Sequence, residues 1–322
     1  MPEGILRIFT KDEAIVQAGA GYLALVAFSY IPYSLSNNYM MSLRAVEKVK
    51  ISTAIYGVSF FVNVFFNYLF IFGAFGAPRM EVAGAALGTV IARVFEFCFI
   101  CGYFLFVDKK ISYRLKHLTM KCRDLVGDYL RISIPVLVSD TLLGLGNNAV
   151  AMVMGRIGAT FVSANAITTV TQQLSTVFIQ GICNASSIIT GHTLGQGDYE
   201  RAQRQGFTFL GLGAVIGVLA GVLIMAISAP VISFYDITEE TKGIAEQLML
   251  AVGFIVIFQS MNSILTKGVL RGGGDTKFLM VADILFLWAA SVPLGALAGL
   301  VWHLPAFWIY TFLKIDQIIK AV

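Results

Sequence analysis

The sequence is poor in charge, in histidine and in cysteine. Charged residues make up 13% of the 322 residues, against about 25% in a soluble domain, which argues against a soluble globular fold. The four cysteines include one C-x-x-C pair, Cys98 and Cys101, without a second pair, whereas a structural zinc site takes four ligands. Because no metal motif, nucleophile elbow or acid pair is present, neither an enzyme nor a bound metal is expected.

Apolar residues dominate the rest of the chain. They make up 57% of it, the mean hydropathy is +0.78, and apolar runs of about 20 residues, the length that spans a bilayer, recur throughout. Unpaired backbone cannot face lipid and the two-residue alternation of a barrel is missing, so the runs predict helices. The sequence therefore predicts an all-α integral membrane protein with about nine transmembrane helices, at residues 15–42, 51–73, 82–107, 129–154, 161–190, 206–229, 246–270, 278–300 and 305–322.

Basic residues gather in alternate loops. Arg44 and Lys50 lie in one such loop, Arg271 and Lys277 in another, and the stretch 108–128 is strongly basic. Because cationic loops stay on the cytoplasmic side, these turns are predicted to be cytoplasmic, in a multi-pass protein of the plasma (inner) membrane whose carboxyl-terminal side is cytoplasmic. The net charge of +4 is spread over these loops, so no nucleic-acid partner is expected.

One local frame occurs twice. Leu43 to Lys50 reads LRAVEKVK, and Leu270 to Lys277 reads LRGGGDTK, 227 residues later. When residues 5–50 are shifted by that distance, nine of 46 positions are identical. The later copy is not a phosphate loop, because an apolar span precedes it and Lys277 follows Thr276 instead of leading it. The repeat predicts two pseudo-symmetric helical bundles, as in transporters built from parallel repeats.

The two predicted bundles differ in length. Residues 1–107 hold three spans of the first bundle, residues 108–128 form a basic cytoplasmic linker, and residues 129–322 hold a second bundle of six spans. The second bundle has three spans upstream of its copy of the repeat, and the first bundle has no counterpart to them. We therefore expect three helices before Met1 and a last helix truncated at Val322, within an intact protein of twelve spans.

Several stretches resemble the multidrug and toxic compound extrusion (MATE) family. Asn63 to Phe97 is similar to its fifth and sixth helices, Arg131 to Ala159 to its seventh, and Gly191 to Gln203 to the loop after its eighth. The resemblance implies two bundles of six helices that export cationic or amphipathic drugs in exchange for H⁺ or Na⁺, without another cofactor. We expect a monomer whose partners are the lipid bilayer and a small-molecule substrate.

Polar residues inside spans are candidates for cation coupling, because such groups are costly in a bilayer. Asn63 and Asn67 share a helical face, and with Thr89 they could ligate a hard cation. The resemblance places the matching positions in a cation site that also uses an acid from the first helix, although the family often has aspartate at the position of Asn67. The alternative is hydrogen bonding between helices.

Two acids are considered for the second bundle. Asp140 lies five residues after Pro135 and is expected to be buried, which would favour its protonated form and suit proton exchange. The resemblance implies that some members use a seventh-helix carboxylate in this way. The alternative for Asp140 is a structural acid paired with Asn147, Asn148 or a neighbouring helix. For Asp283, a solvated or lysine-paired acid is the favoured interpretation.

Two further sets of polar residues complete the predicted site. The candidates for a wet substrate cavity are Asn37, Asn38, Gln172, Gln173, Gln180, Asn184, Gln259 and Asn262. The first two follow Pro32, which predicts a kinked helix. Arg93 and Glu96 are three residues apart on one helical face, and we favour a structural ion pair over a substrate contact.

Two transport functions agree with these residues. The favoured one is a secondary antiporter in which two bundles enclose a cavity and expose it to alternate sides of the membrane. The alternative is a flippase for a lipid-linked sugar or another amphipathic lipid precursor, whose pyrophosphate would require several cations in the cavity. Arg93 is the only cation identified well inside a span, which favours drug export.

Overall fold

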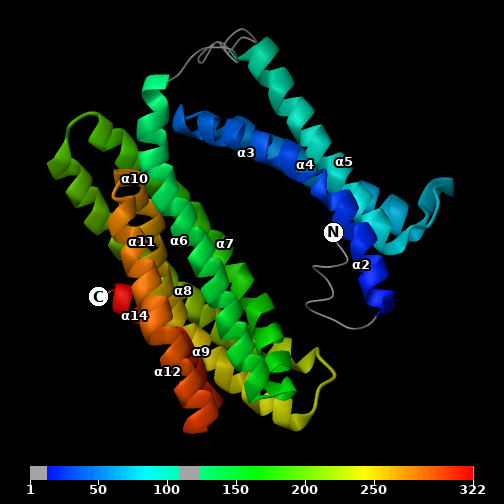
Figure 1. The fold of residues 1–322 in the computed structure, drawn as a ribbon, viewed down its shortest axis with the longest axis vertical. Helices are drawn as coiled ribbons and strands as arrows, with labels where there is room; N and C mark the ends of the chain where they lie inside the picture. The colour runs from blue at the N-terminus through cyan, green and yellow to red at the C-terminus, as the bar shows by residue number, and fades with distance from the viewer. Residues whose placement is uncertain (1–12, 109–122, 322) are drawn as a thin grey trace. The chain divides into compact units, whose positions relative to one another are not determined.

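The computed structural model describes residues 13–108 and 123–321, and these residues are almost entirely helical (Figure 1). The chain divides into two units, Met1–Lys121 and Cys122–Val322, which we call the amino-terminal and the carboxyl-terminal unit. The division falls inside the predicted linker, 108–128, most of which lies outside the described residues.

In the amino-terminal unit, three helical segments pack against one helix. The helices are α2 (Glu13–Ala27), α3 (Tyr30–Ala45), α4 (Val49–Phe72), the short η1 (Ala74–Gly76) and α5 (Glu81–Gly102), which continues as the π-helix η2 (Tyr103–Val107). Helix α5 contacts α2, α3 and α4. Buried side chains from α3, α4, α5 and η2 form the core, namely Met40, Leu43, Ile55, Ile100 and Phe104.

The predicted span 15–42 is two helices instead of one. α2 ends at Ala27 and α3 begins at Tyr30, and the Ser29 hydroxyl donates to the carbonyl oxygen of Val26 at 2.7 Å. Pro32 lies in the first turn of α3, where a missing N–H is tolerated. In a continuous helix, the ring of Pro32 would clash with the carbonyl of Phe28, four residues earlier. The helix therefore breaks one turn before the proline.

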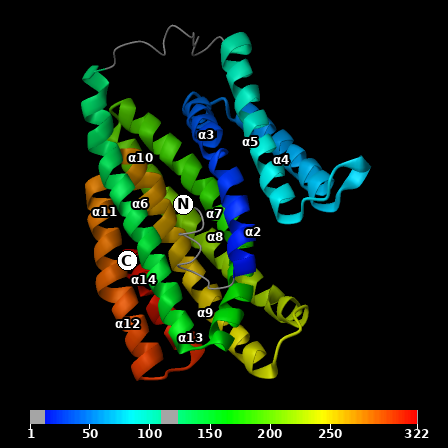
Figure 2. The same ribbon diagram turned by 45° about the vertical axis from the view of Figure 1, so that its right-hand side comes forward.

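The carboxyl-terminal unit is built around α9. Its elements are α6 (Arg123–Ile157), α7 (Ala159–Gly195), α8 (Tyr199–Ser233), α9 (Glu239–Ser263), η4 (Ile264–Leu270), α10 (Arg271–Gly273), α11 (Thr276–Leu285), η5 (Phe286–Ser291), α12 (Val292–Ala296), η6 (Leu297–Val301), α13 (Ala306–Leu313) and α14 (Ile315–Ala321). Helix α9 contacts α7, α8, α13 and α14 (Figure 2). Its most apolar window is 61% buried, against at most 28% in the other long apolar helices of the described chain.

Six helical stretches of the described residues are long and apolar enough to cross a membrane. They are Val49–Phe72, Glu81–Val107, Asp124–Ile157, Tyr199–Ser233, Glu239–Gly273 and Thr276–Val301. Of the other three predicted spans, 15–42 is divided, 305–322 is split into α13 and α14, and 161–190 lies within α7, which carries many Thr, Ser, Gln and Asn side chains. The all-helical membrane fold is confirmed, and the count of nine spans stays a prediction.

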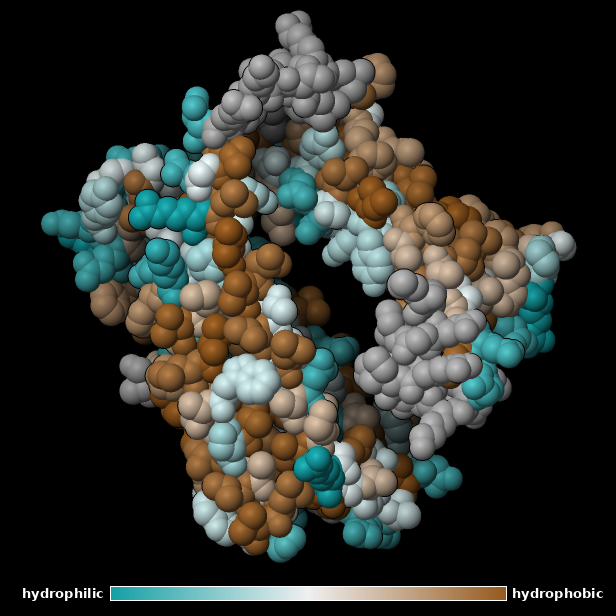
Figure 3. Space-filling model, in the orientation of Figure 1, coloured by the Kyte–Doolittle hydropathy of each residue, from teal (hydrophilic) through white to brown (hydrophobic). Residues whose placement is uncertain are grey.

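Apolar side chains cover much of the outer surface. Figure 3 shows them over the exposed faces of α6 and α12, and Leu137 of α6 and Leu219 of α8 are 68% and 64% exposed. Exposed apolar patches of this extent are rare on soluble monomers. A lipid environment accounts for them, because hydrocarbon does not penalise apolar exposure.

The repeated frame ends a helix in the same way in both copies. The amide of Lys48 donates to the carbonyl of Leu43 at 2.9 Å, and the amide of Asp275 donates to that of Leu270 at 3.2 Å. The residue just before each donor is left-handed, with φ of 66° at Glu47 and 84° at Gly274. This is the Schellman ending of a helix, and it recurs at equivalent positions 227 residues apart.

The residue after the left-handed position differs between the two copies. Asp275 caps α11 by accepting a hydrogen bond from the Phe278 amide at 3.4 Å, as aspartate does at helix starts. Lys48 occupies the same place before α4 and forms an ion pair with Asp108 instead. The carboxylate of Asp108 raises the pKa of Lys48 above its ordinary value. This pair joins the α3–α4 turn to the end of η2.

Helices α8 and α9 approach closely along a row of glycines. A Cβ on Gly217 would lie 2.7 Å from the Cα of Ile257, and one on Gly221 would lie 2.5 Å from the carbonyl oxygen of Gly253. Small residues allow such backbone approach in membrane bundles, where no hydrophobic driving force joins the helices. The contact positions α8 against the central helix of the unit.

Gly221→Ala should lower the melting temperature of the detergent-solubilised protein. The added methyl group would meet backbone that cannot move aside, and overpacking of this kind costs about 1–3 kcal/mol. Gly211→Ala on the same helix is the matched control, because no neighbouring atom lies within 4 Å of its Cβ position and alanine favours a helix by about 1 kcal/mol. Shifts of the same sign and size in both variants would contradict the close packing.

Candidate functional site

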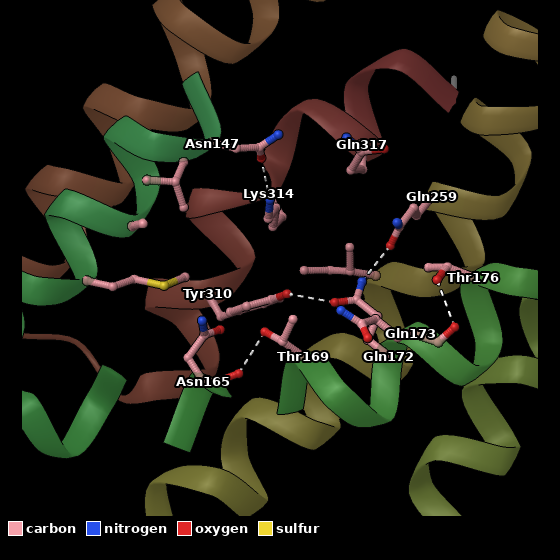
Figure 4. A pocket seen from close by; sticks show the side chains of 14 residues that line it. Asn147, Asn165, Thr169, Gln172, Gln173, Thr176, Gln259, Tyr310, Lys314 and Gln317 are labelled. Carbon is pink, nitrogen blue, oxygen red and sulfur yellow. Dashed lines mark hydrogen bonds between the residues drawn. The ribbon is translucent and has the colours of Figure 1, made fainter. Parts of the chain in front are cut away.

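A cavity of about 380 Å³ opens among helices of the carboxyl-terminal unit. Its walls come from α6, α7, α9, α13 and the start of α14, and Figure 4 shows polar side chains from these elements turned toward one another. The lining residues are Asn147, Val150, Ala151, Met154, Asn165, Thr169, Gln172, Gln173, Thr176, Ile255, Gln259, Tyr310, Lys314 and Gln317. We call this space the amide cavity, because six of its side chains are Asn or Gln.

Hydrogen bonds between helices hold the wall of the amide cavity. Gln172 of α7 donates to the side-chain oxygen of Gln259 on α9 at 2.7 Å, and the Tyr310 hydroxyl donates to Gln172 at 3.4 Å (Figure 4). Lys314 donates to the side-chain oxygen of Asn147 at 3.1 Å. The predicted cavity residues Gln172, Gln173 and Gln259 therefore lie together.

A second cavity, of about 370 Å³, adjoins the first. The two share Asn147, Gln259, Lys314 and Gln317, so they form one polar cleft. The second part differs in charge, because six ionisable side chains line it: Asp140, Lys267, Asp283, Lys314, Asp316 and Lys320. The predicted residue Asn262 also lines this part.

Two carboxylates share one buried lysine at the end of this cleft. The ammonium of Lys320 lies 3.1 Å from Asp283 and 3.0 Å from Asp316, and all three side chains are less than 10% exposed. Because two negative charges face one positive charge, the cluster carries a net negative charge when all three groups are ionised. We call this cluster the Asp–Lys–Asp triad.

Each carboxylate oxygen of the triad accepts at least one hydrogen bond. Ser139 of α6 donates to the oxygen of Asp283 that Lys320 does not contact, at 3.0 Å. Ser291 donates to one oxygen of Asp316 at 2.9 Å and Gln317 to the other at 2.6 Å. Buried charge is tolerated only when it is paired and hydrogen-bonded in this manner, so the triad ties α14 to α11, η5 and α6.

A hydrogen-bonded bridge leads from the triad to the wall of α9. Gln317, which donates to Asp316, accepts a hydrogen bond from the amide of Asn262 at 2.8 Å. The side-chain oxygen of Asn262 is buried and has no hydrogen-bond partner among the described residues. Since Gln317 also lines the amide cavity, one side chain touches both the carboxylate cluster and the cavity.

The expectation that Asp140 is buried is wrong. Its side chain is 51% exposed, and one of its oxygens accepts a hydrogen bond from the Arg271 guanidinium at 2.9 Å. The repeated frame that contains Arg271 thus supplies a counter-ion in addition to ending a helix. The proposed proton-exchange role of Asp140 depended on its burial. Because the carboxylate is exposed and paired with Arg271, the structure does not support that role.

The expectation for Asp283 is correct in one part. The acid is lysine-paired, as favoured, but with Lys320 of α14, and it is buried instead of solvated. The interpretation of Arg93 as the only cation well inside a span is wrong, because Lys314 and Lys320 lie within the predicted span 305–322. The number of cations inside the predicted spans therefore does not count against a flippase.

The amino-terminal unit has a smaller polar cavity, of about 340 Å³, between α4 and α5. The predicted ion pair is present there, with Arg93 2.8 Å from the buried carboxylate of Glu96. Ser59 donates to the same carboxylate at 3.2 Å, and the Arg93 guanidinium lies 4.5 Å from the ring centre of Tyr33. Asn63 and Thr89 also line this cavity.

The three predicted cation ligands of this unit do not converge. Asn67 donates to Asn63 at 3.0 Å, a bond within α4 instead of between helices. The buried oxygen of Asn67 packs against Gly88, and the Thr89 hydroxyl donates to the carbonyl of Ala85 in its own helix. Among the described residues, no group of three or more acidic, His or Cys side chains could hold a metal ion.

The remaining predicted cavity residues lie elsewhere. Asn37 accepts a hydrogen bond from the Tyr56 hydroxyl at 3.3 Å, and Asn38 is exposed and donates to the carbonyl of Ser34. Gln180 and Asn184 of α7 are exposed and line neither part of the polar cleft. Recurrence along one helix did not indicate which turns of α7 face the cavity.

Sequence reasoning missed the triad and Lys314. The signal was present in the last predicted span, where LKIDQIIK places three charges in an apolar run, with Asp316 and Lys320 four residues apart. That spacing puts opposite charges on one helical face. Charged residues at this spacing in an apolar span predict a further charged partner buried beside them. In this structure the partner of Lys320 is Asp283.

A family model named MatE matches residues 1–69 and 135–297. The chain belongs to the MatE family. This confirms the resemblance predicted from the helix and loop motifs, and MatE is a transporter family and not a family of enzymes.

Curated relatives are similar over most of this chain. It is 25% identical over 295 residues to a probable multidrug resistance protein NorM from Thermotoga maritima, and 25% identical over 311 residues to the multidrug resistance protein MdtK from Yersinia pseudotuberculosis. These alignments cover 90% and 92% of the chain but 62% and 66% of the relatives. The chain thus spans less than two thirds of their length.

Solved structures confirm the fold. A crystal structure of a MATE protein in the straight conformation superposes with a TM-score of 0.87 at 18% identity, over 99% of this chain and 70% of the other. A MOP superfamily transporter from Pyrococcus furiosus gives the same TM-score and the same identity and coverage. At this identity the comparison concerns the fold alone.

Removing the shared lysine should destabilise the carboxyl-terminal unit. Lys320→Met would leave two buried carboxylates without their counter-ion, and breaking a buried pair costs about 3–5 kcal/mol. The matched control is Lys242→Met, because Lys242 pairs at 2.7 Å with Glu239, which is 88% exposed, and such surface pairs contribute about 0–1 kcal/mol. The melting temperatures of the two variants in detergent should differ accordingly, and equal losses would contradict the role of Lys320.

Proposed function

We propose that this protein is a secondary active transporter that exports amphipathic toxic compounds in exchange for a cation. The observation that carries the proposal is a polar cleft between helices of a MatE-family chain, with ion-paired carboxylates at one end and an open cavity at the other. Relatives named as multidrug resistance proteins support drugs as cargo. Transport in this form requires that cation and cargo favour different conformations, because only differential affinity shifts such an equilibrium.

The proposed location is the plasma (inner) membrane. Several helices of sufficient length and exposed apolar surface support insertion in a bilayer. The basic turns at Arg44, Lys50, Arg271 and Lys277 support a cytoplasmic position for that side, following the preference of cationic loops. The proposed acting unit is a monomer.

The proposed coupling ion is the proton, and its proposed site is the Asp–Lys–Asp triad. Two carboxylates around one ammonium leave one negative charge in excess. One proton bound to either carboxylate would neutralise that excess charge, and no oxygen atom would have to turn toward the proton. A hard metal cation would instead need several oxygens turned toward it, whereas each carboxylate oxygen here already accepts a hydrogen bond. Protonation of Asp283 would release Lys320 from it and loosen the link between α14 and α11.

The amino-terminal unit is a weaker candidate for coupling. Its described polar cavity holds one carboxylate, Glu96, and Arg93 already neutralises it. Asn63, Asn67 and Thr89 direct their polar groups into their own helices or against Gly88. We therefore propose a structural role for the Arg93–Glu96 pair and place coupling in the carboxyl-terminal unit.

A flippase is not favoured. The polar cleft contains more cations than the sequence suggested, but Lys320 is occupied by the two aspartates of the triad. The relatives' names point to drug resistance. Drug export is therefore the proposal.

Antiport should be measured in liposomes that contain the purified protein and an imposed proton gradient. Addition of a transported compound should dissipate the gradient, and a panel of cationic, neutral and anionic amphipathic dyes covers the possible cargo. Asp283→Asn and Asp316→Asn should each abolish dye-dependent proton flux, because either change removes one of the two proton-accepting carboxylates. A sodium gradient should not replace the proton gradient.

Two control variants separate coupling from folding. Asp140→Asn removes an exposed carboxylate that only Arg271 contacts among the described residues, and Asn67→Ala removes the predicted cation ligand of the other unit. Both should retain proton coupling. Absence of gradient-dependent flux with every dye would contradict the transport proposal, and loss of coupling in Asn67→Ala alone would move the coupling site to the amino-terminal unit.

A further inference from the structure

The amide cavity carries an unusual charge for a site expected to take cationic drugs. Among the described residues that line it, none is acidic, and its only ionisable side chains are Lys314 and Tyr310. The other polar walls are amides and hydroxyls, which are neutral. A cationic ligand would find no carboxylate here and would face the ammonium of Lys314.

Lys314 is within electrostatic range of Asp316 but forms no ion pair with it. Its hydrogen-bond partner is the neutral side-chain oxygen of Asn147, at 3.1 Å. The nearby carboxylate of Asp316 belongs to the triad, where it pairs with Lys320, and Lys314 forms no ion pair with a described acid. An ammonium has three donors, so at least one stays available to a ligand in the cavity.

One wall of the same cavity is apolar. Val150, Met154 and Ile255 line it together with the ring of Tyr310. Methionine adapts to ligands of different shape, and an aromatic ring offers a flat apolar surface. The cavity therefore combines one positive charge, amides on the sides and an apolar floor, which is the arrangement that an amphipathic anion requires.

We propose that the amide cavity binds amphipathic molecules that carry one anionic group, such as a carboxylate, with that group on Lys314. This deepens the proposed function and rests on it: the cargo class becomes amphipathic anions or zwitterions instead of simple cations. Asn147 positions the ammonium, and the amides of Gln172 and Gln173 offer further donors to the head group.

The cavity favours a single negative charge over a pyrophosphate. It offers one ammonium, whereas a pyrophosphate carries at least two charges and would leave one of them desolvated without a partner. Lys320, on the far side of the shared wall, is held by two aspartates. Within the amide cavity, the single lysine therefore favours a monoanion over the head group of a lipid-linked sugar.

Equilibrium dialysis of the full chain in phosphatidylcholine nanodiscs tests this inference without a gradient. The probes are 2-naphthoate, 2-naphthylmethanol and 2-naphthylmethylammonium, which share one apolar body and differ in charge. Empty nanodiscs correct for partitioning into lipid. The wild-type protein should bind naphthoate at least about tenfold more tightly than the ammonium probe, as one charge-assisted hydrogen bond provides.

Four variants assign the preference to Lys314. Lys314→Gln should abolish the preference for naphthoate, whereas Lys314→Arg should keep it. Asn147→Asp should abolish it as well, because the new carboxylate would neutralise Lys314 while the lysine stays in place. Lys242→Gln, in an exposed ion pair outside the cleft, should bind as the wild type does.

The outcomes are distinct from those of the transport test. Equal or tighter binding of the ammonium probe, an unchanged preference in Lys314→Gln, or displacement of naphthoate by inorganic pyrophosphate would each overturn the inference. Transport without a naphthoate preference would leave the antiporter proposal intact and remove only this inference. A naphthoate preference without transport would leave the binding site and remove the antiporter.

Discussion

The carboxyl-terminal unit depends on the burial of one lysine between two aspartates. Lys320 can be buried only because Asp283 and Asp316 neutralise it and because Ser139, Ser291 and Gln317 satisfy the remaining carboxylate oxygens. These contacts join α14 to three other elements of the unit. Helix α14 is short and has little surface for packing. Its ion pairs and hydrogen bonds therefore hold it in place.

The two units use buried charge in related ways. In each, a carboxylate on a long helix faces a basic residue and a serine, as Glu96 does with Arg93 and Ser59. The amino-terminal pair is balanced, with one charge of each sign. The triad is not balanced, because two carboxylates face one ammonium, and this difference is why we propose it as the coupling site.

The polar cleft has carboxylates in one part and amides in the other, and Lys314 lines both parts. The triad has one negative charge in excess, and the amide cavity has the ammonium of Lys314 without an ion-pair partner among the described residues. Gln317 lies between them and touches both. Binding at one end therefore has a short physical route to the other, through one side chain that also contacts Asn262 of α9.

The amino-acid sequence was sufficient to predict the membrane class, the helical character of the chain and the repeated helix ending. Lipid permits few backbone conformations, and a left-handed helix ending leaves a local pattern, so apolar runs and the frame at Leu43 and Leu270 were enough. The family followed from the same motifs. Individual cavity residues such as Gln172 and Gln259 could be proposed because amides inside spans are costly.

The pairing of charges depends on helix packing and could not be predicted from the sequence. Asp140 and Arg271 are 131 residues apart, Asp283 and Lys320 are 37 apart, and neither pairing follows from local spacing. Helix packing turned Asp140 outward, buried Asp283 and placed Lys314 between the amide cavity and the carboxylates of the second part of the cleft. The sign of a binding site depends on such pairings, because each partnered charge is lost to the ligand, and a single chain sequence does not reveal the partners.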